Sequence, residues 1–256
     1  MTQTTNTIQG IIFDYGGTID TDSRHWAEVL WDSYQKNHVP VDKESFRQAY
    51  VHGERTLARE PLVKPTHDFH DVLCIKTGLQ MRHLWEQGLL PSAEAAEDMA
   101  RTVADDCHQT VLQTLEHTRP VVTMLAREYP LVLVSNFYGN IAHILQQYGL
   151  RDCFSHIIES SVVGVRKPDP AIFQLGVEAL GLAASSVVVV GDSYTKDILP
   201  ARSIGCQTVW LKGTGWTPGE GDDNVPDVVI RSLTQLPEWI ATRRQHLSFL
   251  PFCCSK

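Results

Sequence analysis

Short apolar runs rich in β-branched residues recur along the chain and end at polar or glycine-rich turns. The first is Ile8 to Phe13, which stops at Asp14 and is followed by Gly16 and Gly17. Such a run is typical of a strand buried on both faces. Comparable runs, separated by segments with helical spacing, are Leu131 to Val134, Ile157 to Ile158, Val187 to Val190 and Thr208 to Leu211. This alternation predicts an α/β fold of the Rossmann-like kind, a parallel sheet with helices on both faces.

A long helical insertion is predicted after the first strand, between Thr21 and Thr118. Apolar residues recur there at helical spacing, as in Trp26, Val29, Leu30 and Tyr34, in Phe69, Val72 and Leu73, and in Ala96, Met99, Val103, Cys107 and Val111. We therefore predict an α/β core of residues 1–20 plus 119–245, an all-helical cap domain of residues 21–118, and a tail of residues 246–256. Arg119-Pro120 is expected to mark the return to the core. A solvated loop from Gly213 to Asn224 is expected to precede Val225 to Ile230 and a final helix around Leu233 to Arg243.

Composition limits the classes of partner. The chain has 256 residues, 43% of them hydrophobic, and a net charge of −8, without a block of Lys and Arg of the kind that tracks nucleic acid. No apolar run reaches the length of a membrane span, and the first residues lack the apolar core of a signal peptide, so we expect a cytoplasmic protein with no membrane partner. The 6 cysteines have no CxxC spacing and are expected to be reduced. The sequence leaves the oligomeric state open.

Polar residues able to do chemistry follow the predicted strands. They are Asp14, Thr18, Ser135, Lys167, Asp192 and Asp197. In open α/β sheets the carboxyl edge of the strands is where ligands bind. Three aspartates converging on one edge would repel one another unless a cation lay among them, which is an argument for a bound metal ion.

Four segments carry a specific resemblance. FDYGGTID, VSNF, GVRKPDP and VVVVGDSYTKD are similar, in this order, to the four motifs of the haloacid dehalogenase superfamily of phosphatases and related hydrolases. The match covers nearly all of the chain outside the helical insertion. The resemblance implies a hydrolase with a lid over its site, and for the phosphatases of the superfamily a Mg²⁺ ion and a small phosphorylated substrate.

The chemistry of the residue types assigns roles to the catalytic candidates Asp14, Ser135 and Lys167. The Asp14 carboxylate can attack phosphorus and be released by water, which divides one difficult step into two. The Ser135 hydroxyl and the Lys167 ammonium can meet the charge of the transferred group. Asp192, helped by Asp197, can hold Mg²⁺, a hard ion that prefers oxygen ligands.

The resemblance implies further roles. Asp14 and the backbone carbonyl of Gly16 are expected to complete the metal shell. The amides near Gly17 and Asn136 are expected to bind phosphate oxygens together with Ser135 and Lys167. Thr18 is similar to a threonine that supports the nucleophile loop.

Gly16 departs from the phosphatase pattern, in which a second aspartate protonates the leaving oxygen and then activates water. Loss of a positioned acid or base costs ~10²–10⁴ in rate. The substrate is therefore expected to have a leaving group that needs little protonation, such as an acyl or aryl phosphate. Asp20, Asp22 and His25 are candidates for a replacement acid, although hinge hydrogen bonds or helix caps are the more common use of such residues.

Other activities stay open. Dehalogenases of the superfamily also lack the second aspartate, but they use no magnesium and lack the acidic pair of the last motif. Phosphonatases need a lysine in the helical insertion for a Schiff base, and the lysines available are Lys36, Lys43, Lys64 and Lys76. A catalytically weak protein that binds phosphorylated ligands is the alternative outside enzymes. The aromatic residues Trp26, Trp31, Tyr34 and Trp85 are expected to form the core of the helical insertion, and nothing in that segment identifies the substrate.

Overall fold

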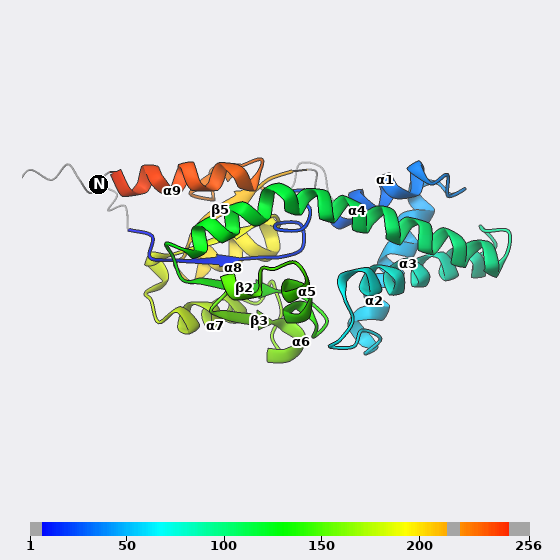
Figure 1. The fold of residues 1–256 in the computed structure, drawn as a ribbon, viewed down its shortest axis with the longest axis horizontal. Helices are drawn as coiled ribbons and strands as arrows, with labels where there is room; N and C mark the ends of the chain where they lie inside the picture. The colour runs from blue at the N-terminus through cyan, green and yellow to red at the C-terminus, as the bar shows by residue number, and fades with distance from the viewer. Residues whose placement is uncertain (1–6, 214–220, 246–256) are drawn as a thin grey trace, which may run out of the picture.

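The structure is a computed structural model that describes residues 7–213 and 221–245. The predicted tail of residues 246–256 and the larger part of the predicted loop from Gly213 to Asn224 lie outside the described residues. Within them, the α/β prediction is confirmed: a parallel sheet is flanked by helices, and a group of long helices extends from one end (Figure 1).

The sheet of the described residues has 6 strands in the order β3-β2-β1-β4-β5-β6, and every neighbouring pair is parallel. The strands are β1 (Gly10–Phe13), β2 (Leu131–Ser135), β3 (His156–Glu159), β4 (Val187–Gly191), β5 (Gln207–Leu211) and β6 (Val228–Ile230). The first and last strands are shorter than the apolar runs that predicted them. The run from Ile8 pairs only from Gly10 onward, and the run from Val225 pairs only from Val228 onward.

Alternate residues of the strands are buried on opposite faces of the sheet, in two hydrophobic clusters. Ile11, Leu133 and Val190 belong to a hydrophobic cluster with residues of α4, α5 and α9. Ile12, Val132 and Val189 belong to a second cluster with residues of α7 and α8. Side chains of a strand point alternately to opposite faces, so helices on both faces require the continuous apolar runs seen in the sequence.

The helices are α1 (Trp26–Lys36), α2 (Lys43–Arg59), α3 (Phe69–Glu86), α4 (Ala93–Ala126), α5 (Ile141–Gln147), α6 (Ser160–Val163), α7 (Ala171–Leu180), α8 (Leu199–Ser203) and α9 (Leu236–Gln245). Helices α1 to α3 and most of α4 lie within the predicted insertion, and we call α1 to α4 the inserted helices (Figure 1). Each begins after a side chain that accepts a hydrogen bond from a backbone N–H of the first turn, and these N-cap residues are His25, Asp42, Asp68 and Ser92.

Helix α4 does not end where the sequence suggested a return to the core. It has 34 residues and continues through Pro120 to Ala126. Its last turns pack on the sheet through Val122 and Leu125, while its first part packs on α3. The Thr118 hydroxyl donates to the carbonyl of Ile19 at 2.8 Å, which ties this helix to the loop after β1. The domain boundary at residue 118 stays a prediction, and it falls inside one continuous helix.

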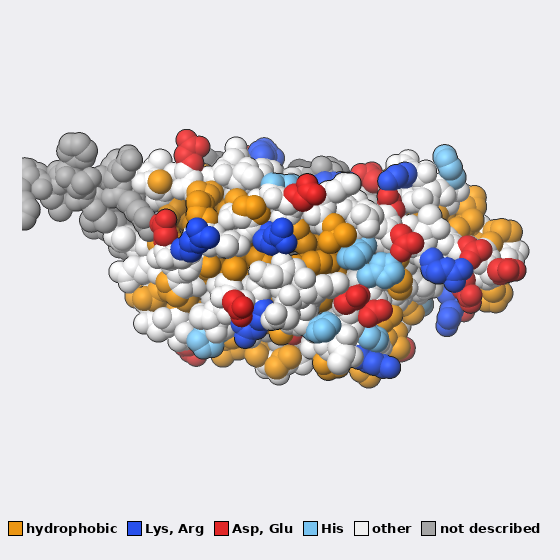
Figure 2. All heavy atoms as spheres, viewed as in Figure 1, with side chains coloured by type: hydrophobic (Ala, Val, Ile, Leu, Met, Phe, Trp, Pro, Cys, Tyr) orange, Lys and Arg blue, Asp and Glu red, His pale blue; other side chains and the backbone are white. Residues whose placement is uncertain are grey.

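On the face shown in Figure 2, acidic and basic side chains are interspersed among hydrophobic ones. The described residues visible there form no broad basic area. None of the helices described is both long enough and apolar enough to cross a bilayer.

Candidate active site

The nucleophile candidate Asp14 lies where the order of the strands reverses. The chain runs from β1 to β2 and β3 on one side and then to β4, β5 and β6 on the other. Ligands bind in such sheets at the carboxyl edge between the two strands that flank this reversal. Asp14 directly follows β1, and its backbone N–H donates to the carbonyl of Val190 in β4 at 3.0 Å. The fold therefore places Asp14 at the expected binding edge.

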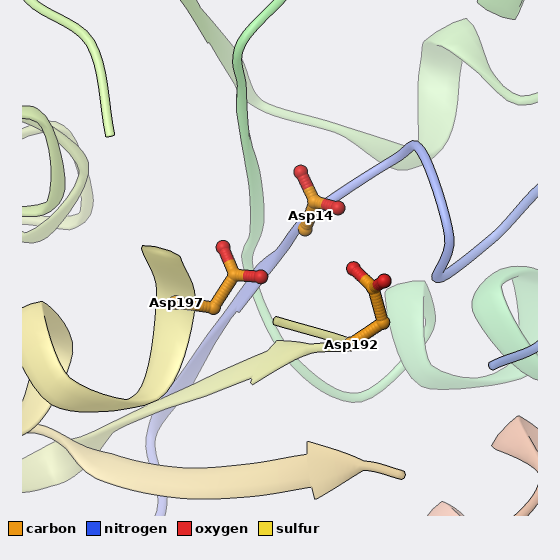
Figure 3. Close-up of side chains that lie close together, drawn as sticks. All are labelled: Asp14, Asp192 and Asp197. Carbon is orange, nitrogen blue, oxygen red and sulfur yellow. The ribbon is translucent and has the colours of Figure 1, made fainter. Parts of the chain in front are cut away.

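Three carboxylates meet at this edge. Asp14, Asp192 and Asp197 each offer an oxygen, and these oxygens lie within 4.8 Å of one another (Figure 3). Asp192 follows β4, and Asp197 lies on a single π-helical turn, Tyr194–Ile198. The N–H of Ser193, the residue after Asp192, donates to Asp197 Oδ2 at 3.1 Å. This hydrogen bond fixes the Asp197 carboxylate relative to Asp192.

Lys167 lies between two of the carboxylates. Its Nζ is 2.6 Å from Asp14 Oδ1 and 2.6 Å from Asp197 Oδ1, and the side chain is 3% exposed. The Asn136 side chain holds Lys167 in place by donating to its carbonyl at 3.0 Å and accepting from its N–H at 2.9 Å. These two hydrogen bonds to the backbone of Lys167 help to hold its ammonium in contact with Asp14.

Burial and the neighbouring charges shift the pKa values of this cluster. Burial is the main cause that raises the pKa of Asp14 to about 6, Lys167 opposes the shift, and Asp197 adds to it. Burial, followed by the charges of Asp14 and Asp197, raises the pKa of Asp192 well above its ordinary value. Burial alone would lower the pKa of Lys167, but the two carboxylates it contacts raise it overall.

A divalent cation fits this group. Three carboxylates and one ammonium leave a net charge of −2 when all are ionised. Hard oxygen ligands of this kind suit Mg²⁺, which binds through a few carboxylates and keeps several waters. The predicted ligands Asp14, Asp192 and Asp197 are brought together, and the contribution of the Gly16 carbonyl stays a prediction.

Some of the predicted phosphate-binding residues line the cavity and others lie beside it. Ser135 and Asn136 line the same cavity as Asp14 and Lys167. The N–H of Gly17 donates to Asp20 Oδ1 at 2.7 Å, and the binding of phosphate by this amide stays a prediction. Thr18 is fully buried, and its hydroxyl donates to Asp14 Oδ2 at 3.4 Å, in keeping with a supporting role in the nucleophile loop.

The side chains considered as a replacement acid make structural contacts. Asp20 is fully buried and accepts from the N–H of Gly17 and from Trp26 Nε1, at 2.7 and 2.9 Å. Asp22 accepts from the N–H of Leu233 at 2.6 Å and from the Ser232 hydroxyl at 2.8 Å.

His25 caps α1 by accepting from the N–H of Ala27 at 3.1 Å, and it alone of the three lines the cavity. Because a helix-capping nitrogen must stay unprotonated, His25 is poorly suited to donate from that atom.

A cavity of about 590 Å³ joins the sheet edge to the inserted helices. Its walls include the polar cluster below and, above it, aromatic side chains of the inserted helices and of the segment after β2, namely His25, Trp26, Tyr50, Phe69, Phe137 and Tyr138. Lys76 and Glu54 also line it. Trp26 was expected in the core of the helices, but it is partly buried against that core and faces the cavity as well.

Lys76 is one of four lysines that the sequence offers in the inserted helices and their connections. A signal was present, because Phe69, Val72 and Leu73 define an apolar face of α3 and Lys76 follows on the same face. A lysine at such a position is buried, and Lys76 is 8% exposed.

Comparisons with known proteins agree with the geometry. Residues 8–205 match the family model for haloacid dehalogenase-like hydrolases. Haloacid dehalogenase-like hydrolase domain-containing protein 3 of Danio rerio is 41% identical over 118 residues, or 44% of this chain and 45% of that one, so the match spans less than half of that protein. The protein of the same name from Mus musculus is 26% identical over 223 residues, or 80% of this chain and 88% of that one.

A phosphoglycolate phosphatase from Vibrio parahaemolyticus is 29% identical over 165 residues, or 60% of this chain and 72% of that one. Among solved structures, an L-2-haloacid dehalogenase has a TM-score of 0.60 at 20% identity and covers 92% of this chain and 100% of that one. At this identity the likeness shows the shared fold alone.

Proposed function

The chain belongs to the haloacid dehalogenase-like hydrolase family, and from this premise we propose that it hydrolyses a small phosphorylated metabolite through an aspartyl-phosphate on Asp14. The observation that carries the proposal is the contact of Lys167 Nζ with both Asp14 and Asp197 at 2.6 Å, beside Asp192. This arrangement combines a carboxylate nucleophile with the positive charge that a phosphoryl group requires.

In the proposed first step, an Asp14 oxygen forms a bond to phosphorus while the bond to the leaving oxygen breaks. Lys167 then faces the oxygens of the transferred group, and Ser135, at the end of β2, also lines the cavity. Mg²⁺ held by the three aspartates would supply further positive charge for the phosphoryl oxygens. In the second step a water oxygen forms a bond to phosphorus while the bond to the Asp14 oxygen breaks, which releases inorganic phosphate carrying the water protons and restores the Asp14 carboxylate.

Phosphorus chemistry is favoured over release of halide. Halide departs without a metal ion, and a site built for it has no use for two further carboxylates beside the nucleophile. Asp192 and Asp197 supply such a pair. Phosphatase-named relatives support the same choice.

A phosphonatase is less well supported. Its Schiff base requires a neutral lysine amine in the inserted helices, whereas Lys76, the lysine of these helices that lines the cavity, forms an ion pair with Glu54 at 2.7 Å. Burial lowers the pKa of Lys76, but Glu54, Tyr138 and Tyr50 together raise it well above its ordinary value, which favours the ammonium form. Gly16 remains the one argument for a catalytically weak protein that only binds phosphorylated ligands.

We further propose that residues 21–118 act as a cap on a core of residues 1–20 plus 119–245. The support is the cavity, whose walls come from both parts. A cap that closes over the site excludes water and contributes to substrate selection. A cytoplasmic location remains part of the proposal.

The test is hydrolysis of an aryl phosphate by the purified chain with and without Mg²⁺, compared with the Asp14→Asn variant. The proposal requires activity that depends on both the metal ion and Asp14, and acid-stable trapping of phosphate on the wild-type chain. Metal-independent halide release from a 2-haloacid would select the dehalogenase. Phosphate binding without turnover would select the weak binder.

A further inference from the structure

The inserted helices place a buried positive charge in the wall of the cavity, on Lys76 of α3. The residue is 8% exposed, although an ammonium is among the groups least often buried. Its Nζ lies 2.7 Å from Glu54 Oε1 on α2, and both residues line the cavity that also contains Asp14. A buried ion pair is weak evidence of stabilisation, because the cost of removing two charges from water offsets their attraction. The pair therefore invites a functional explanation.

Two aromatic rings hold the ammonium from other sides. Nζ lies 5.8 Å from the ring centre of Trp26 and 6.0 Å from that of Tyr138. Trp26 belongs to α1, while Tyr138 belongs to the core segment that follows β2. Lys76 thus lies where the inserted helices meet the core, and its position is fixed by contacts from both sides.

Trp26 also connects Lys76 to the position of the missing aspartate. A Cβ placed on Gly16 would lie 3.8 Å from Trp26 Nε1 and 3.8 Å from Trp26 Cδ1. The indole thus borders both Lys76 and the space that a side chain at residue 16 would enter. Lys76 therefore lies on the side of the cavity where an aspartate at residue 16 would donate a proton and where Gly16 donates none.

The geometry of phosphoryl transfer also places the leaving group near Lys76. Phosphoryl transfer requires the attacking and leaving oxygens to be roughly in line through phosphorus. Asp14 projects from the edge of the sheet, so a leaving group opposite it extends toward the inserted helices, where the aromatic walls and Lys76 lie. Flat, conjugated groups suit such walls because they can stack on the rings.

We propose, on the basis of the function proposed above, that Lys76 contacts the departing oxygen and stabilises its negative charge, with Glu54 positioning the ammonium. The substrates would be phosphate esters or anhydrides of planar, acidic leaving groups, that is, aryl, enol or acyl phosphates. As the Asp14–phosphorus bond forms, the bond from phosphorus to the departing oxygen breaks and its electron pair stays on that oxygen. The oxygen leaves as an anion hydrogen-bonded to Lys76, no proton leaves the lysine, and none is needed from residue 16.

The experiment compares kcat/KM for a series of substituted phenyl phosphates whose phenols differ in acidity, using the full chain, Lys76→Met, Lys76→Arg and the exposed control Lys36→Met. Removing a donor aimed at developing charge costs ~10²–10³-fold in comparable sites, so we expect Lys76→Met to lose about 100-fold on the poorest leaving groups and little on the best. The slope of rate against phenol acidity becomes steeper, Lys76→Arg recovers part of the loss, and Lys36→Met follows the wild type. An equal loss across the series, or none, overturns the proposal.

A binding measurement separates this proposal from the failure of the proposed function. Nitrophenolate, the anionic product of nitrophenyl phosphate, and uncharged nitrobenzene are titrated into the wild type and Lys76→Met by calorimetry. We expect the variant to lose about tenfold in affinity for nitrophenolate alone, which corresponds to ~1.4 kcal/mol. If the wild type binds nitrophenolate through Lys76 but shows no Asp14-dependent hydrolysis, only the proposed function fails. Equal nitrophenolate affinity in the two proteins overturns the role of Lys76.

Discussion

Gly17 lies directly against the carboxylate of Asp192. A Cβ at Gly17 would come within 2.3 Å of Asp192 Oδ2, and the residue has a φ of +90°, a region that other residues rarely adopt. The loop after β1 and the end of β4 therefore approach as closely as backbone permits. This contact brings the nucleophile loop to the acidic pair.

Gly17→Ala is expected to displace Asp192 or the nucleophile loop. The left-handed conformation alone costs an L-residue about 1–2 kcal/mol, and a misplacement of about 1 Å at a site lowers rates by ~10²-fold. Activity on an aryl phosphate and the unfolding free energy would both be measured. The matched control is Gly78→Ala in α3, where an added Cβ meets nothing within 4 Å, so a gain of about 0.5–1 kcal/mol with unchanged activity is expected. Wild-type activity in Gly17→Ala would contradict the importance of the contact.

Divalent cations are expected to stabilise the folded chain through the three aspartates. An ion at about 100 times its dissociation constant raises the unfolding free energy by ~2.7 kcal/mol. Melting temperatures with and without Mg²⁺ would be compared for the wild type, for Asp192→Asn, and for Asp152→Asn as an exposed control. We expect the Mg²⁺ effect to shrink in Asp192→Asn alone. An equal shift in all three proteins would place the ion elsewhere.

His25 predicts how stability changes with pH. Burial, followed by the charge of Lys196, lowers its pKa to about 4 in the folded chain, below the ordinary value of 6.5. Between these values the unfolded chain binds more protons than the folded one, so stability falls as the pH falls from 6.5 toward 4.

His25→Asn keeps a good N-cap and removes this titration. Urea unfolding of both proteins across that pH range should show the wild type losing stability relative to the variant as the solution is acidified. A constant difference between the two proteins would show that His25 does not titrate in this way.

The sheet and its carboxyl edge followed from local patterns. Strands such as Val187–Gly191 are buried on both faces, and this requires the unbroken apolar runs that the sequence displays. The polar residues after those runs meet because parallel strands end at one edge. The contact between Lys167 and Asp197 needed in addition the order of the strands, which no local pattern contains.

The inserted helices were predicted less completely. The spacing of Phe46, Ala49, Gly53 and Leu57 on α2 is helical, although its polar neighbours obscure it. Pro120 was interpreted as a boundary, yet α4 passes through it, since packing of Val122 and Leu125 on the sheet outweighs a local helix breaker. Trp26 could not be assigned to core or cavity from spacing alone, because it contacts both.

Gly16→Asp tests whether the site lacks only its acid. The nearest atoms to a Cβ at this position lie 3.8 Å away, on Trp26, and Asp20 Oδ2 lies at 4.0 Å, so an added Cβ makes only ordinary van der Waals contacts. The nearby Asp20 carboxylate would raise the pKa of the new aspartate, which suits an acid that must be protonated near neutrality. We expect turnover of alkyl phosphates to rise by ~10²-fold or more, while aryl phosphates change less. Steady-state rates on a matched alkyl and aryl pair measure this difference. No gain on the alkyl phosphate would show that the cavity selects against such substrates by other means, with Lys76 and the aromatic walls the first residues to vary.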